Sequence, residues 1–130
     1  MTLRVDRIET TNGTVGVSSE ALGKASHQAW CHSNNQTPII NGSFNVTSQT
    51  DHGTGDFTYT FTNSFVSPFF VPSSYGGNGV DSATLRIATY EQNSVLGTNQ
   101  HRTLWVATSA GSGGAVDQEV AAIKWLGELS

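Results

Sequence analysis

The segment at residues 57–62 constrains the fold of this chain more than any other part of the sequence. It reads Phe57-Thr58-Tyr59-Thr60-Phe61-Thr62, so aromatic and threonine side chains alternate strictly. Successive side chains of a β-strand point to opposite faces of a sheet, so this spacing puts three rings on one face and three hydroxyls on the other. The segment therefore predicts a half-buried strand with Phe57, Tyr59 and Phe61 in a core.

A second alternating run precedes this strand and predicts its partner. Phe44 and Val46 alternate with polar residues, and two glycines flanked by aspartates lie within residues 51–56. Glycine and aspartate favour turns, so residues 42–62 predict a β-hairpin. We expect Phe44 and Val46 to join the core from the first strand of this hairpin. Trp30, in a further strand at residues 28–32, is expected to join them.

The middle and later parts of the chain predict further short strands. Residues 81–90 and 102–108 alternate between apolar and polar side chains. Residues 64–71 are apolar but contain proline, which suits an edge strand or an irregular strand. Residues 73–79 and 109–114 are rich in glycine and predict loops.

The two ends of the chain differ from its middle. Residues 116–129 fit both a helical spacing and a period of two, and a late glycine and the all-β context favour a strand. Residues 1–25 contain no aromatic residue, and they predict an N-terminal arm or a short strand. Residues 26–130 then form the folded domain. We expect an all-β fold, a small antiparallel β-sandwich of about six to eight short strands.

The composition argues against several classes of protein. Only 12% of the 130 residues are charged, which is about half the usual share, whereas Ser and Thr together number 31. The net charge of −4 argues against a nucleic-acid partner. No apolar run reaches the roughly 18 residues of a membrane span, so we expect no membrane insertion. The single cysteine excludes an intrachain disulfide.

No set of residues predicts catalysis, a metal site or a cofactor. Cys31 and His32 are adjacent, and adjacent side chains of a strand point to opposite faces, so they do not form a nucleophile and base pair. The four histidines lack the spacing of a zinc motif. Asp51 and Asp56 lack the spacing of a calcium-binding loop and are expected to cap a turn.

A motif between residues 29 and 61 resembles that of a known family. It combines Ala29-Trp30, then Ser43-Phe44-Asn45-Val46-Thr47-Ser48, then Gly53-Thr54-Gly55-Asp56-Phe57. This combination is similar to one near the distal end of tail-fibre-like virion proteins of tailed bacteriophages. The opening residues 3–8 and the closing residues 120–127 also resemble the ends of such proteins.

The resemblance implies a non-enzymatic structural protein of a bacteriophage virion, assembled in the cytoplasm of the bacterial host. The sandwich would form a homotrimer, and residues 1–25 would attach it to other virion proteins. A short tail fibre or fibre tip that contributes to host attachment is the leading hypothesis. A capsid decoration or head-fibre protein and a lectin-like receptor-binding module stay open as alternatives. Trimerisation would cover apolar edges that one small sandwich leaves exposed.

Two predicted loops carry residues suited to a receptor site. Sites for sugars combine an aromatic platform with amides and carboxylates, and loops at one end of a sandwich often carry binding residues. Tyr75, Asn78 and Asp81 form one such set, and Tyr90 and Asn93 belong to a second. These two sets are the candidate sites for a host surface glycan, and polar surface loops without a ligand are the alternative.

Overall fold

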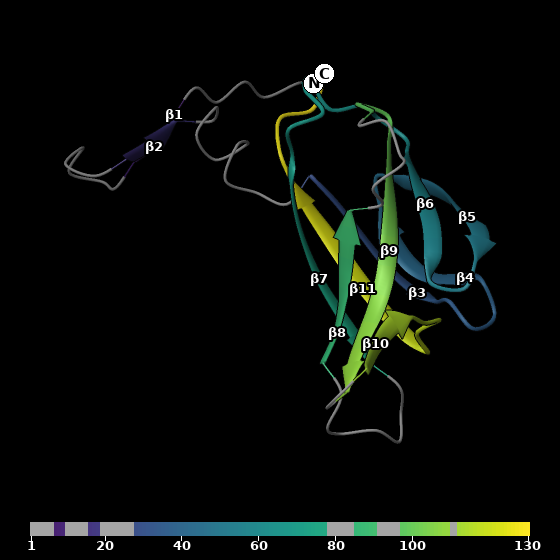
Figure 1. The fold of residues 1–130 in the computed structure, drawn as a ribbon. Coiled ribbons are helices and arrows are strands. Elements are labelled where there is room, and N and C mark those ends of the chain that lie inside the picture. The colour runs from purple at the N-terminus through teal and green to yellow at the C-terminus, as the bar shows by residue number, and fades with distance from the viewer. Residues whose placement is uncertain (1–6, 10–15, 19–27, 78–84, 91–96, 110–111) are drawn as a thin grey trace.

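The computed structural model describes residues 7–9, 16–18, 28–77, 85–90, 97–109 and 112–130. The strands in these residues follow one another as Figure 1 shows. Their bounds are β1 Arg7–Glu9, β2 Gly16–Ser18, β3 Ala29–Asn34, β4 Ile39–Phe44, β5 Val46–Gly53, β6 Asp56–Phe61, β7 Val71–Gly77, β8 Leu85–Tyr90, β9 Gln100–Ser109, β10 Ser112–Ala115 and β11 Val120–Leu126. The described residues form no helix, and therefore none that could span a membrane.

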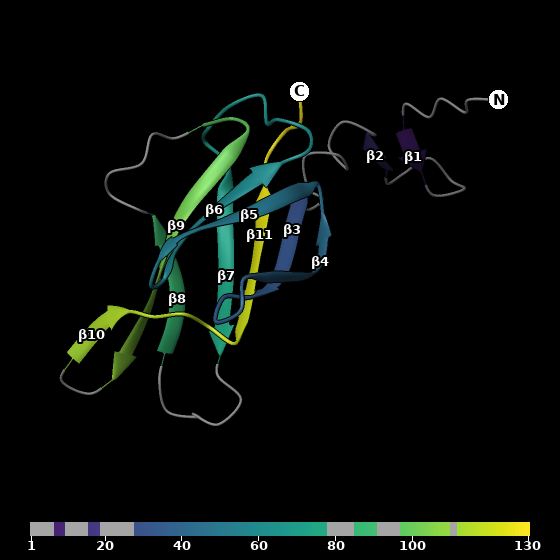
Figure 2. The ribbon, with the colours of Figure 1, turned by 90° about the vertical axis from the view of Figure 1, so that its right-hand side faces the viewer.

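Two antiparallel sheets make up most of the structure. The four-stranded sheet has the order β4-β3-β11-β7, and the five-stranded sheet has the order β10-β9-β6-β5 with β8 also paired to β9. Figure 2 shows β5 and β6 crossing β3 and β11 obliquely, as in a sandwich of two layers. Within the predicted arm, β1 and β2 pair with each other as a separate sheet. The prediction of an all-β fold with antiparallel sheets is confirmed.

The long strand β9 organises the five-stranded sheet. One edge of β9 pairs with β8, and the other edge pairs first with β6 and then with β10. Between these two partners, the backbone N–H of Trp105 donates to the oxygen of Gly55 at 2.7 Å. The glycines at 113–114, which predict a loop, lie instead in β10, because β9 continues past β6 and its backbone groups need partners there.

The core lies between the two sheets and is largely aromatic. Its buried apolar residues are Ala29, Cys31, Val46, Phe57, Tyr59, Phe61, Phe65, Phe70, Trp105, Ala121, Ile123 and Trp125. Trp125 of β11 meets Tyr59 and Phe61 of β6 edge to face, with ring centroids 5.5 and 5.1 Å apart. Val46, Phe57, Tyr59 and Phe61 thus lie on the inner face that the alternation predicts.

Trp30 and Phe44 lie outside the core, so their prediction as core residues is wrong. Ala29, Cys31 and Ser33 are the buried residues of β3, and Trp30, between the first two, is 42% exposed on the opposite face. Phe44 of β4 pairs with Trp30 of β3 and is 53% exposed. The inner face of β3 holds small residues because the ring of Trp125, the neighbour of Ala29 in β11, already fills that space.

Asn45 forms the corner at which the chain passes from one sheet to the other. Its φ of 55° lies in the left-handed region, which asparagine tolerates better than most residues. Its Nδ2 donates to the backbone oxygens of Gln28 and Asn63, both at 3.1 Å, and its Oδ1 accepts from the N–H of Asn63 at 2.7 Å. Because of this corner, the hairpin of β5 and β6 begins at Val46 rather than at residue 42.

Gly55 and Asp56 fix the turn between β5 and β6 against the rest of the sandwich. Gly55 has a φ of 73°, and a Cβ there would lie 2.6 Å from the backbone oxygen of Trp105, so glycine alone fits. The N–H of Gly55 donates to Oδ1 of Asp117 at 2.7 Å. Asp56 accepts two hydrogen bonds from the guanidinium of Arg102, at 2.8 and 2.5 Å, and this pairing lowers the pKa of Asp56.

Replacing Phe57 by alanine should lower the free energy of unfolding by about 3–5 kcal/mol, because the buried ring would leave a cavity. Phe44→Ala is the matched control. Its ring is half exposed, so its loss should cost less than about 1 kcal/mol. Denaturation in urea measures both values, and equal losses in the two variants would contradict the faces assigned to these rings.

His101 is a buried ionisable group in the core. The indole Nε1 of Trp125 donates to its Nδ1 at 2.8 Å, so the proton of the neutral imidazole sits on Nε2. Burial lowers the pKa of His101 from 6.5 to about 4. Protonating the ring in the folded state would also remove the acceptor that Trp125 uses.

The free energy of unfolding should therefore fall as the pH decreases from 6.5 to about 4. In this range the unfolded chain takes up a proton on His101 and the folded chain does not. The free energy of unfolding therefore keeps the full contribution of the neutral His101 only above pH 6.5. At about 1.4 kcal/mol per pH unit, this group accounts for a loss of about 3 kcal/mol. Urea denaturation at several pH values, compared with His101→Gln, measures the loss. An unchanged slope in the variant would contradict it.

Candidate functional site

The outer face of the four-stranded sheet carries the side chains of the candidate site. The inward residues of its central strand β11 are Ala121, Ile123 and Trp125. The residues between them, Ala122 and Lys124, consequently point outward. The same alternation directs every second residue of β3 and β7 to this outer face.

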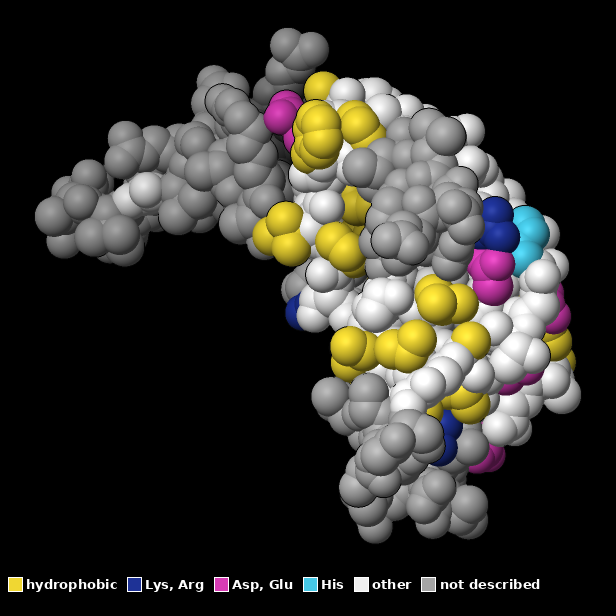
Figure 3. Space-filling model, in the orientation of Figure 1, with side chains coloured by type: hydrophobic (Ala, Val, Ile, Leu, Met, Phe, Trp, Pro, Cys, Tyr) yellow, Lys and Arg dark blue, Asp and Glu magenta, His cyan; other side chains and the backbone are white. Residues whose placement is uncertain are grey.

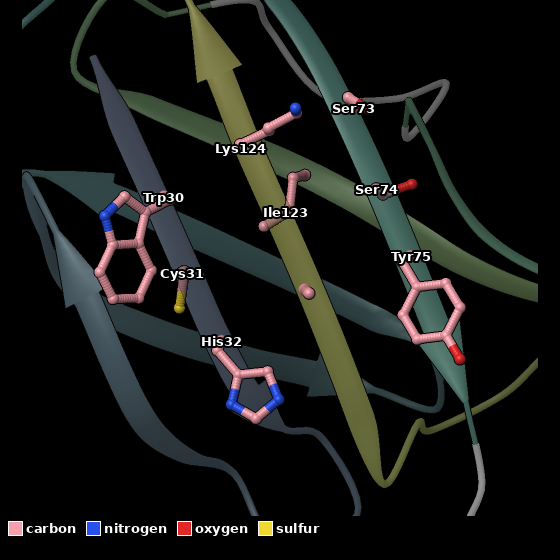
Figure 4. Close-up of a pocket in the computed structure, with 9 residues that line it drawn as sticks. Trp30, Cys31, His32, Ser73, Ser74, Tyr75, Ile123 and Lys124 are labelled. Atoms are coloured by element: carbon pink, nitrogen blue, oxygen red, sulfur yellow. The ribbon is translucent and has the colours of Figure 1, made fainter. Parts of the chain in front are cut away.

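The strand register sorts these outward side chains into two neighbouring rows. The rows are Trp30–Lys124–Ser73 and His32–Ala122–Tyr75, each running from β3 over β11 to β7. Neighbouring strands lie about 4.8 Å apart, so β3 and β7 are separated by about 10 Å. Figure 4 shows Trp30 and Tyr75 on opposite sides of β11.

The two rows enclose a groove of about 260 Å³. Trp30 and Tyr75 form its two walls (Figure 4). Ala122 of β11 lines the space between them, and its small methyl group keeps the groove open. Tyr75 is 67% exposed, so both aromatic walls are accessible. The volume lies just below the roughly 300–1,000 Å³ of sites for drug-sized ligands. The groove therefore suits a single small ring rather than a large cofactor.

The groove combines aromatic walls with a few polar groups. His32, Ser73 and Lys124 supply hydrogen-bonding groups, and no acidic side chain is among the described residues that line the groove. Apolar and aromatic surface with a few placed polar groups is the usual composition of a site for a small ligand. Aromatic rings offer flat faces to such a ligand, and the polar groups fix its orientation.

Tyr75 lies on a strand, so the prediction of a loop is wrong for residues 73–77. β7 pairs with β11 along its whole length. Gly76 accounts for the misleading composition: a Cβ there would lie 3.1 Å from the ring of Trp105 and 3.2 Å from Cβ of Arg86. The glycine lets β7 close over the core and does not make a turn.

Ser74 ties the strand that carries Tyr75 to the opposite sheet. Its Oγ accepts a hydrogen bond from the backbone N–H of Ala88 in β8 at 2.9 Å. β7 is thus held by β11 on one side and by β8 on the other. This double attachment gives the tyrosine wall of the groove a fixed position.

Tyr75 alone among the expected glycan-binding residues has a described side chain. Asn78, Asp81 and Asn93 lie outside the described residues, and Tyr90 is the last residue of β8, with only its backbone described. Within the described residues, Tyr75 shares its groove with Trp30 and with polar residues of β3 and β11.

Sequence reasoning missed Trp30, His32 and Lys124 as residues of one site. The signal for them is the alternation in β3 and β11. Once Cys31 and Ile123 are assigned to the core, their neighbours must face outward. The pairing of β3 with β11, which brings these neighbours together, has no local signal in the sequence.

Cys31 and His32 lie on opposite faces of β3, as adjacent residues of a strand must. Burial raises the pKa of the Cys31 thiol to about 11, which keeps it protonated and unreactive. Across the described part of the chain, no three His, Cys, Asp or Glu side chains gather as a metal site would require.

A second group of polar side chains lies inside the sandwich. Ser33 Oγ and Gln49 Nε2 both donate to Oδ1 of Asn35, at 2.9 and 2.7 Å. Ser33 and Asn35 are fully buried, and burial also raises the pKa of nearby Tyr59 to about 12. These groups bind one another and tie β3 to β5, so they stabilise the fold rather than present a surface to a ligand.

No protein-family model, no curated protein and no solved structure matches this chain.

Proposed function

We propose that this chain is a non-enzymatic β-sandwich protein of a bacteriophage virion, and that it contributes to host attachment by binding a surface saccharide. The groove between Trp30 and Tyr75 is the observation that carries the binding part of this proposal. The motif between residues 29 and 61 supports the virion setting through its resemblance to tail-fibre-like proteins. In this proposal, residues 1–25 attach the sandwich to other virion proteins.

The chemistry of a sugar ring matches the groove. One face of a pyranose is made of C–H groups, and its rim carries hydroxyls. The rings of Trp30 and Tyr75 offer apolar faces on which the C–H face of the sugar can pack. The polar groups of His32 and Ser73 offer hydrogen-bond partners for its hydroxyls. Because the walls stand on paired strands, the site is formed before the ligand arrives, and binding costs little ordering.

Replacing either aromatic wall should weaken saccharide binding by about tenfold or more, since central aromatic anchors often contribute 2 kcal/mol or more. The variants are Trp30→Ala and Tyr75→Ala. A glycan array first identifies a ligand for the unaltered chain. A calorimetric titration with that ligand then gives the affinity of the unaltered chain and of both variants, because its signal does not depend on Trp30.

Phe69→Ala is the control for these variants. Phe69 is 82% exposed and lies outside the groove, so the variant should bind the saccharide as the unaltered chain does. Melting temperatures close to that of the unaltered chain exclude unfolding as the cause of lost binding. The proposal of a saccharide site fails if the unaltered chain binds no glycan on the array, or if Trp30→Ala and Tyr75→Ala retain full affinity.

The proposed virion protein acts as a homotrimer. Exposed apolar side chains support this: Val66, Phe69, Val71 and Leu126 are all accessible. Leu126 pairs with Val71, and the N–H of Val66 donates to the backbone oxygen of Glu128 at 2.8 Å, so three of them lie near the end of β11. Figure 3 shows several hydrophobic groups on one face of the molecule. A three-fold assembly would cover such groups by symmetry.

Light scattering on the purified chain should give a mass of about 41 kDa, three times the 13.8 kDa of one chain. Phe69→Asp should shift the mass towards that of one chain, because an unpaired carboxylate in an apolar interface is costly. Thr50→Asp, at an exposed site on β5, is the control and should keep the mass of the trimer. A single-chain mass at every concentration of the unaltered protein would contradict the trimer.

A further inference from the structure

Among the described residues that line the groove, Lys124 is the one lysine or arginine. It stands on the central strand β11, between Trp30 of β3 and Ser73 of β7 in the register. Figure 4 shows it between the two walls, on the outer face of the sheet. Its ammonium group therefore lies where a substituent of a bound ring would project.

The two other Lys or Arg side chains that the structure describes, those of Arg86 and Arg102, have partners within the fold. Arg102 pairs with the carboxylate of Asp56, and Arg86 is buried and donates to Oε1 of Gln118 at 3.2 Å. Among the described residues, Lys124 takes part in no ion pair. Its position therefore provides an exposed positive charge in a groove whose described lining residues include no carboxylate.

We infer that the groove selects an acidic saccharide, in which a carboxylate or phosphate on the sugar ring binds the ammonium of Lys124. This inference rests on the proposed saccharide site and adds the class of ligand. Stacking of the ring on Trp30 and Tyr75 would hold the sugar, and Lys124 with Ser73 would bind the anionic substituent. Hydrogen bonds between an ammonium and an anionic oxygen are stronger than those between neutral groups.

The net charge of the chain cannot attract an acidic ligand, so the attraction has to come from a cation within the groove. The net charge is −4, so the long-range field of the protein disfavours anions. A preference for an acidic ligand must then come from a nearby cation whose field is not cancelled by a carboxylate. Charges across a solvent-exposed groove are partly screened by salt, so the preference should be moderate and should depend on ionic strength.

Matched pairs of sugars test the inference directly. Methyl β-glucuronide and methyl β-glucoside differ at C6, where the first carries a carboxylate and the second a hydroxymethyl group. Glucose 6-phosphate against glucose tests phosphate in the same position. The unaltered chain should bind at least one acidic sugar about three- to tenfold more tightly than its neutral partner at low salt. Comparing the affinity ratio of the glucuronide pair with that of the phosphate pair shows whether the groove prefers a carboxylate or a phosphate.

Lys124→Gln should reduce the ratio of acidic to neutral affinity to about one, and Lys124→Arg should keep most of it, because arginine retains the charge. Thr50→Glu is the charge-matched control. It changes the net charge by the same amount as Lys124→Gln but lies on the other sheet, so the ratio should stay as in the unaltered chain. Raising NaCl to about 0.5 M should reduce the ratio in the unaltered chain.

Three outcomes separate the inference from the function on which it rests. Equal affinity of the unaltered chain for acidic and neutral sugars, with binding lost in Trp30→Ala, overturns the selection of acidic ligands and leaves the saccharide site standing. A preference that survives in Lys124→Gln overturns the role of Lys124. Binding of no sugar by the unaltered chain, together with no ligand on the glycan array, overturns the saccharide site and the inference with it.

Discussion

Trp125 joins the two sheets, and the rest of the structure depends on this contact. From β11 its ring reaches Tyr59 and Phe61 of β6, and its Nε1 donates to His101 of β9. A fully buried indole needs a partner for its N–H, and the neutral imidazole supplies the acceptor. One side chain thus contributes apolar packing and a hydrogen bond across the sandwich, which sets both the spacing and the register of the layers.

The same strand that buries Trp125 also builds the groove. With Trp125 and Ile123 directed inward, Lys124 and Ala122 must lie on the outer face. A shift of the register by one residue would exchange the two sets, placing a charge in the core and an indole in water. The groove is therefore as well specified as the core, because the energy of the core fixes which side chains face out.

The sequence predicts those features whose signal lies within one strand, and it misses those that depend on pairing between distant strands. The strands β6 (Asp56–Phe61) and β11 (Val120–Leu126) have local alternation, and both form. Trp30 is misplaced because a large aromatic residue is usually buried, whereas the preceding Ala29 occupies the inner position beside Trp125. Gly76 resembles a turn residue in sequence and is a packing residue in space, since its neighbour Trp105 comes from another strand. Signals that depend on pairing between distant strands cannot be read locally.

Apart from Phe44, which pairs with Trp30, the exposed aromatic residues fall into two groups, which our proposal assigns to two kinds of partner. Trp30 and Tyr75 flank a hollow with polar groups between them, so a ligand there can gain both ring contact and hydrogen bonds. Phe69 lies outside that hollow, and its neighbours Val66 and Val71 in the chain add exposed apolar area of the kind that another protein surface covers. Each group would be costly to expose without a partner, at about 25 cal/mol for each Å² of apolar surface. Recognition of a small ligand and association between chains can therefore occupy different parts of one small sandwich.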